Sequence, residues 1–156
     1  MVKIKIIAIG KDKDTWVSDG CAHFVKLLGR WAKVEFVVVP SLKNTASLSP
    51  TLIKQKEAER LLPAITTGHV VALCDSGRKM DTSAFSKWLE GTASKSGGTI
   101  TFIIGGAYGL DDRVLDKADE VLSLSSLTFS HQLVRLVLLE QLYRALSILQ
   151  GTDYHK

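Results

Sequence analysis

The chain has 156 residues, of which 46% are hydrophobic and 23% charged, a composition that is typical of a folded protein and excludes a disordered one. A formal net charge of +4 favours a partner that carries phosphate, but it is too small to hold naked RNA by charge alone. The apolar run Ile4–Ile9 is interrupted by Lys5 and is too short for a signal sequence or a membrane span. We therefore expect a cytoplasmic protein that binds no membrane.

Segments with strand and helix periodicity alternate along the whole chain. The first half predicts, in order, a strand at Val2–Ile9, a helix capped by Asp14, a strand at Val34–Val39, a polar loop at Ser41–Ser49 and a helix from Pro50 to about Leu62 capped by Ser49. The second half predicts a strand at Val70–Leu73, a helix capped by Asp81 and ending near Thr92, a strand at Ile100–Ile104, a helix from Asp111 to about Lys117, a strand at Glu120–Leu122 and a helix from about Ser130 to Leu149. This alternation predicts one α/β domain over residues 1–156, a mostly parallel sheet with helices on both faces.

The two cysteines, Cys21 and Cys74, lie in apolar surroundings and lack the spacing of metal ligands. We expect both to be buried free thiols of a reducing compartment. The chain also offers no metal-ligand cluster, no Ser/His/Asp set and no carboxylate pair at a defined spacing. A metal site and hydrolytic chemistry are therefore not expected.

Ligands of open α/β sheets gather at the carboxyl ends of the strands, and a glycine-rich turn follows one such end here. Gly105 and Gly106 lack a β-carbon, so the backbone can turn sharply and a ligand can approach it closely. The order G-G-x-x-G, after a late strand, departs from the dinucleotide-binding fingerprint. A tight strand-to-helix turn without a ligand is the alternative.

A second candidate segment, Leu122–Ser130, alternates apolar and hydroxyl residues. A half-buried strand explains this pattern as far as Ser125, but residues 126–130 lead directly into a helix start. Backbone N–H groups and hydroxyls at a helix start are well placed to hold a polar ligand.

The last predicted helix is apolar on almost every side, which indicates burial on more than one face. In a chain this small we expect the second face to pack on another copy, so we predict a homodimer. Arg135 falls within the apolar arc, and it must either be paired or face a site near the helix start. For Arg144, an ion pair and an RNA contact are equal alternatives.

The chain ends in residues that suit RNA, although a terminal tail is often frayed and inert. Tyr154 can stack on a base, whereas His155 and Lys156 can meet phosphate. His131, at the predicted start of the last helix, is either a candidate for chemistry or a residue without a task.

Three motifs together resemble one known family: IIGGAYG (residues 103–109), LSLSSLTFSHQLVRLVLLEQLYRA (122–145) and YHK (154–156). The family is the SPOUT-class ribosomal RNA large-subunit methyltransferase H, whose members methylate N3 of a pseudouridine. The resemblance covers essentially the whole chain. It implies a C-terminal trefoil knot, S-adenosylmethionine as cofactor, a homodimer, and a large-subunit ribosomal RNA substrate met in assembled ribosomes.

Site residues follow from the same resemblance. The cofactor is expected at Leu73, Gly105, Gly106, Leu124, Ser125, Ser126, Leu127, Thr128 and Phe129. Catalytic roles are expected for His131, Arg135, Tyr154 and His155: the cations would stabilise the anion that develops on the base, and Tyr154 would stack it. RNA contacts are expected from Arg144, Tyr154, His155 and Lys156, with the tail of one subunit completing the site of its neighbour.

Two positions depart from the family pattern. Ser130 stands where proline usually precedes the histidine, and a serine can cap the helix instead. Asp153 stands where proline or another residue is often found. Three alternatives stay open: a nucleotide-binding oxidoreductase, a non-catalytic RNA-binding or ribosome-assembly module, and a SPOUT enzyme acting on another base.

Overall fold

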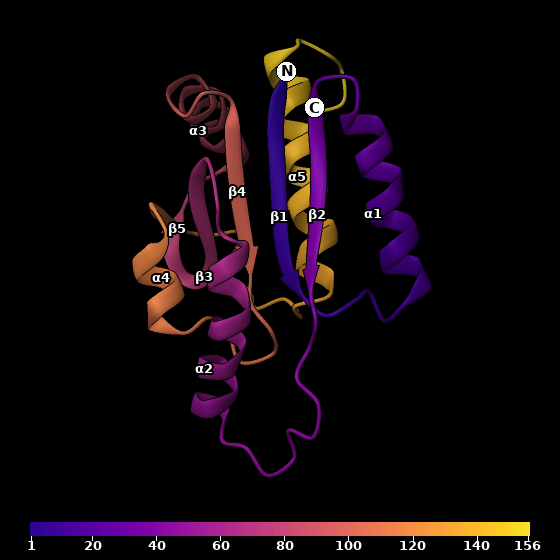
Figure 1. Cartoon of the computed structure of the whole chain (residues 1–156). Coiled ribbons are helices and arrows are strands. Elements are labelled where there is room, and N and C mark those ends of the chain that lie inside the picture. The colour runs from indigo at the N-terminus through magenta and orange to yellow at the C-terminus, as the bar shows by residue number, and fades with distance from the viewer.

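A single five-stranded sheet forms the centre of the computed structural model, which describes residues 1–156 (Figure 1). Its strands are β1 (Val2–Ile9), β2 (Ala32–Val39), β3 (His69–Lys79), β4 (Thr99–Ile104) and β5 (Glu120–Ser123). They lie in the order β2-β1-β4-β3-β5, and every neighbouring pair is parallel. The predicted parallel α/β fold is therefore confirmed, and all five strands end at the same edge of the sheet.

Helices cover both faces of this sheet, as predicted. They are α1 (Thr15–Leu28), α2 (Pro50–Leu61, followed by a 3-10 turn at Leu62–Ala64), α3 (Thr82–Lys95), α4 (Asp112–Lys117) and α5 (Leu133–Leu149). The core on one face joins the sheet to α1, α3 and α5, and the core on the other joins it to α2 and α4. None of the helices combines the length and apolarity that a membrane-spanning helix requires.

The helix caps show how local sequence sets these boundaries. Ser49 accepts a hydrogen bond from the Leu52 N–H at 3.1 Å, and Asp81 accepts one from the Ala84 N–H at 2.8 Å, so both predicted caps are confirmed. Asp14 lies at the predicted cap position of α1, but its side chain makes no capping hydrogen bond.

Strand β3 differs most from its prediction, because it continues past Leu73 to Lys79. Its register on β5 shifts between Leu73 and Arg78, which makes the intervening residues a bulge. A β-carbon at Gly77 would lie 2.5 Å from the Leu122 carbonyl carbon, so only glycine allows this close approach. Small polar residues resemble a turn in sequence, which is why the prediction ended too early.

The two cysteines have different surroundings, although both are free thiols as predicted. Cys21 lies on the buried face of α1, and burial, with a smaller contribution from Asp12, raises its pKa to about 11. Cys74 is only partly buried, so the prediction of a second buried thiol was wrong. Cys74 is the first residue of the β3 bulge, directly after Leu73, which still pairs with β5.

Candidate functional site

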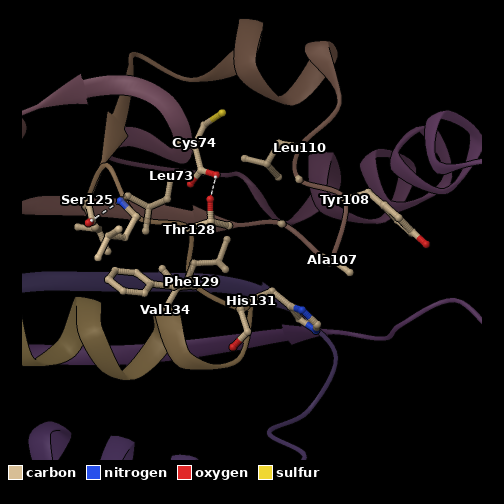
Figure 2. A pocket seen from close by; sticks show the side chains of 18 residues that line it. Leu73, Cys74, Ala107, Tyr108, Leu110, Ser125, Thr128, Phe129, His131 and Val134 are labelled. Atoms are coloured by element: carbon tan, nitrogen blue, oxygen red, sulfur yellow. Dashed lines mark hydrogen bonds between the residues drawn. The ribbon is translucent and has the colours of Figure 1, made fainter.

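A cavity of about 580 Å³ lies where the strands end, and Figure 2 shows the side chains that line it. Its walls come from three segments that are distant in sequence: the bulge after β3, the turn after β4 and the connection from β5 to α5. The volume is typical of a small-molecule site. The lining residues are Leu73–Asp75, Ile104–Leu110, Leu124, Ser125, Leu127–His131 and Val134.

Most of the residues expected to hold a cofactor line this cavity. They are Leu73, Gly105, Gly106, Leu124, Ser125, Leu127, Thr128 and Phe129. Ser126 does not line it and instead faces a smaller hollow beside Lys79 and Asp81. Cys74, Asp75 and Tyr108 line the cavity but were not singled out from the sequence, where only their position directly after a strand could have indicated them.

The glycine turn leaves no room for a β-carbon at Gly105, where it would meet backbone, and Gly106 lies against the carboxyl of Glu57. A β-carbon at Gly105 would lie 2.8 Å from the Gly109 carbonyl carbon and oxygen, and one at Gly106 would lie 2.5 Å from Oε2 of Glu57. The Gly109 N–H closes the turn by donating to the Gly106 oxygen at 3.1 Å, and Gly109 has a φ of 87°. The cavity is therefore lined here by bare backbone, as the absence of β-carbons predicted.

Side-chain hydrogen bonds join the other two walls. Thr128 donates from Oγ1 to the Asp75 carboxylate at 3.1 Å and so links the β5–α5 connection to the β3 bulge (Figure 2). Within the connection, the Leu127 N–H donates to Ser125 Oγ at 2.9 Å. The bond between Thr128 and Asp75 therefore joins two lining segments that are 53 residues apart in sequence.

Ser130 begins the turn that leads into α5. Its Oγ accepts from the Leu133 N–H at 3.1 Å, and its carbonyl accepts from the Val134 N–H at 3.0 Å. This is the arrangement expected of a serine that replaces proline at a helix start. The helix itself begins at Leu133, three residues later than predicted, because residues 131 and 132 form this turn.

His131 is the candidate catalytic residue that the fold brings to the cavity (Figure 2). Burial lowers the pKa of its imidazole, and the charges of Arg135 and Lys13 lower it further. Each of these effects disfavours the imidazolium form. His131 is therefore better suited to accept a proton at neutral pH than to supply a positive charge.

Arg135 lies beneath the site and does not line it. Its side chain is 1% exposed, and the guanidinium donates to the carbonyls of Ile9 at 2.6 Å and Gly10 at 2.8 Å. It also pairs with Asp12 at 3.1 Å. Of the two alternatives for this arginine, the structure shows the paired one, in which it joins the start of α5 to the end of β1.

The C-terminal tail folds back on the last turns of α5 and is not frayed. Tyr154 donates to Glu140 Oε1 at 3.1 Å, and Arg144 pairs with the same oxygen at 2.6 Å. The Arg144 guanidinium carbon lies 4.8 Å from the centre of the Tyr154 ring, and its Nη1 lies 3.3 Å from Nδ1 of His155. The ion pair considered for Arg144 therefore exists, within its own helix.

The tail begins at the end of α5 that lies away from the cavity. Figure 1 shows that α5 runs from the edge where the strands end back to the edge where they begin. A helix of 17 residues is about 25 Å long. The lining of the cavity in one subunit includes none of Arg144, Tyr154, His155 and Lys156, and all three tail residues stay exposed.

A family model described as "Predicted SPOUT methyltransferase" matches residues 2–155. The chain is therefore a SPOUT methyltransferase. It is 42% identical over 159 residues to ribosomal RNA large subunit methyltransferase H of Leuconostoc citreum, and 40% identical to the proteins of that name from Streptococcus thermophilus and Bacillus cytotoxicus. Each alignment covers 99% of this chain and 100% of the relative. The chain thus belongs to the ribosomal RNA large subunit methyltransferase H family.

Solved structures share the fold at much lower identity. A probable methyltransferase from Bordetella pertussis superposes with a TM-score of 0.61 at 14% identity, covering 93% of this chain and 96% of that one. The tRNA (m1G37) methyltransferase from Aquifex aeolicus superposes with a TM-score of 0.56 at 16% identity, covering 99% of this chain and 73% of that one. At such identities the likeness shows the fold alone. Membership in a methyltransferase family sets aside the oxidoreductase that the glycine turn left open.

Proposed function

We propose that this protein transfers a methyl group from S-adenosylmethionine to N3 of a pseudouridine in large-subunit ribosomal RNA. The names of its relatives support large-subunit ribosomal RNA as the substrate and methyl as the group transferred. The resemblance of the three sequence motifs supports N3 of pseudouridine as the acceptor. The single observation that carries the proposal is the cavity, which two of the three family motifs, residues 103–109 and 122–145, line together with the bulge after β3. The enzyme would act in the cytoplasm on assembled ribosomes, whose shape would compensate for its modest net charge.

The lining of the cavity fits S-adenosylmethionine. Leu110, Phe129 and Val134 provide apolar surface for an adenine ring, and bare backbone at Gly105 and Gly106 allows close approach. Hydroxyl and carboxylate groups on the other two segments suit a ribose and an ammonium group. The expected trefoil knot would involve these same segments, since all of them meet at one edge of the sheet.

When bound, S-adenosylmethionine supplies a methyl group that its sulfonium already activates. The protein must then hold the base in line and remove the proton on N3. We assign the removal of the N3 proton to His131, because the effects that lower the pKa of its imidazole favour the neutral form. This replaces the cationic role first expected of it. Arg135 acts as a positioning residue, since its Nε lies 3.4 Å from the His131 carbonyl oxygen.

A homodimer would bring the tail to the cavity. Leu133, Val137 and Ile148 lie on α5 at spacings of about one helical turn or multiples of it, and each is partly exposed in the isolated subunit. If two copies of α5 pack with opposed directions, the end of one lies beside the start of the other. Tyr154 and His155 of each subunit would then meet the cavity of its neighbour, while Arg144 and Lys156 contact RNA phosphates.

Methyl transfer to defined ribosomes tests this function. Ribosomes from a strain that lacks the gene should accept a tritiated methyl group, and nucleoside mass spectrometry should find it on N3 of a pseudouridine. A methyl group on another base would support a different SPOUT specificity. Saturable binding of S-adenosylhomocysteine by calorimetry separates both from a non-catalytic ribosome-binding module, which should bind none.

A further inference from the structure

A buried acid lies directly behind the glycine turn, and no role assigned so far uses it. Glu57, on α2, is 7% exposed, although carboxylates are almost never so buried without a partner. Its Oε1 has no hydrogen-bond partner, and no ion pair joins the carboxyl to a cation. Burial raises the pKa of Glu57, and Arg60 offsets part of that rise.

The cation next to it along α2 is already engaged. Arg60 donates from Nη1 to the carbonyls of Pro40 at 2.8 Å and Ser41 at 3.0 Å, and so holds the loop after β2. Neither a hydrogen bond to Oε1 nor an ion pair therefore offsets the burial of the Glu57 carboxyl, and the charge of Arg60 does so only in part. Ionisable groups whose pKa is shifted by burial are concentrated at functional sites.

The position of the Glu57 carboxyl relative to Gly106 suggests a function for it. Its Oε2 occupies the space that a β-carbon of Gly106 would need, with only 2.5 Å between them. Gly106 lines the cavity and Glu57 does not, so the carboxyl meets the turn from outside the cavity. One backbone turn thus separates this carboxyl from a ligand in the cavity.

We propose that Glu57 is a selectivity residue, whose carboxylate lies behind the glycine turn as a fixed negative charge that favours a sulfonium ligand over its neutral thioether. This inference rests on the proposed function. S-adenosylmethionine and S-adenosylhomocysteine differ in the methyl group and in the positive charge on sulfur. When the methyl group has moved to the base, the sulfur is neutral and the attraction to Glu57 is lost. The carboxylate would thereby help the spent cofactor to leave.

The test compares the two ligands by isothermal titration calorimetry on the full-length protein. In Glu57→Gln, which keeps the size but not the charge, affinity for S-adenosylmethionine should fall about tenfold, while affinity for S-adenosylhomocysteine stays within about twofold. Glu59→Gln is the matched control, because it makes the same charge change at an exposed position of α2 and should leave both affinities unchanged. Glu57→Asp keeps the charge, so it should preserve most of the ratio.

The outcomes separate this inference from the proposed function. If the ratio of the two affinities is the same in Glu57→Gln as in the unaltered protein, the carboxyl only fills space and the inference is overturned. If the unaltered protein binds neither ligand, the proposed function fails first. Should the Gln variant not fold, Glu57→Met repeats the test, because it is similar in size, carries no charge and leaves no polar group buried.

Discussion

The guanidinium of Arg135 donates to the carbonyl oxygen of Ile9 at 2.6 Å, which ties the start of α5 to the last residue of β1. These residues are 126 positions apart in sequence. The contact holds the last helix on the strand with which the chain begins, next to the cavity wall to which His131 contributes.

Replacing Arg135 with Met should destabilise the fold. The change leaves two buried carbonyls and Asp12 without their partner, so the free energy of unfolding should fall by about 3 kcal/mol. Urea denaturation of the variant and the unaltered protein measures this difference in the free energy of unfolding. Arg144→Met is the matched control, since its partly exposed ion pair with Glu140 should contribute no more than about 1 kcal/mol. Equal losses in the two variants would contradict the assigned role of Arg135.

His131 should act as a base at unusually low pH. A histidine can accept a proton only when its imidazole is neutral, and the lowered pKa keeps the imidazole of His131 neutral to more acidic pH. In a plot of kcat/KM against pH, the midpoint of the acidic limb should therefore lie below about 6.5, the ordinary pKa of histidine. His131→Ala should abolish that limb and most turnover while S-adenosylhomocysteine still binds. A limb above the ordinary value would argue against His131.

The tail should serve turnover and not cofactor binding. Tyr154→Ala and His155→Ala should each reduce methyl transfer, whereas calorimetry with S-adenosylhomocysteine should give nearly unchanged affinity, because neither residue lines the cavity of its own subunit. Loss of cofactor binding in either variant would refute this division of roles.

Mixed dimers test whether two subunits share each site. His131→Ala and Tyr154→Ala should each be nearly inactive, but a randomly mixed dimer of the two should recover about a quarter of full activity, because half of the dimers then contain one intact composite site. Methyl-transfer assays after subunit exchange measure this. No recovery would place both residues in the same subunit's site.

Glu57 should make stability depend on pH. Because its folded pKa lies above the ordinary value of 4.5, the native state holds its proton more tightly than the unfolded state. Its contribution to stability is therefore greatest at low pH and declines as the pH rises through the ordinary value toward the folded pKa. The Tm of Glu57→Gln relative to the unaltered protein should rise over this range, and that of Glu59→Gln should not.

The two thiols should react differently. Cys74 is partly exposed in the cavity, whereas Cys21 is buried and has a pKa of about 11, so a maleimide should label Cys74 alone in the folded protein. S-adenosylhomocysteine should protect Cys74, and mass spectrometry would follow both sites. Labelling of Cys74 at the same rate with saturating ligand would mean that the ligand does not occupy this cavity.

Local patterns in the sequence were sufficient for the order and type of the elements. Ser49 and Asp81 cap their helices because each cap depends on a hydrogen bond only three residues long in sequence. The glycine turn and the hydroxyl-rich connection could be placed at the cavity for a similar reason: both directly follow strands, and parallel strands end at one edge.

Contacts between distant residues were decided only by the tertiary structure. Nothing near Arg135 in sequence indicates its partners on β1, and nothing near Glu57 indicates that Gly106 will lie against it. The bulge of β3 depends likewise on the backbone of β5. Periodicity and capping are short-range effects that the chain carries locally, whereas burial, charge and pKa depend on which remote groups the fold brings together.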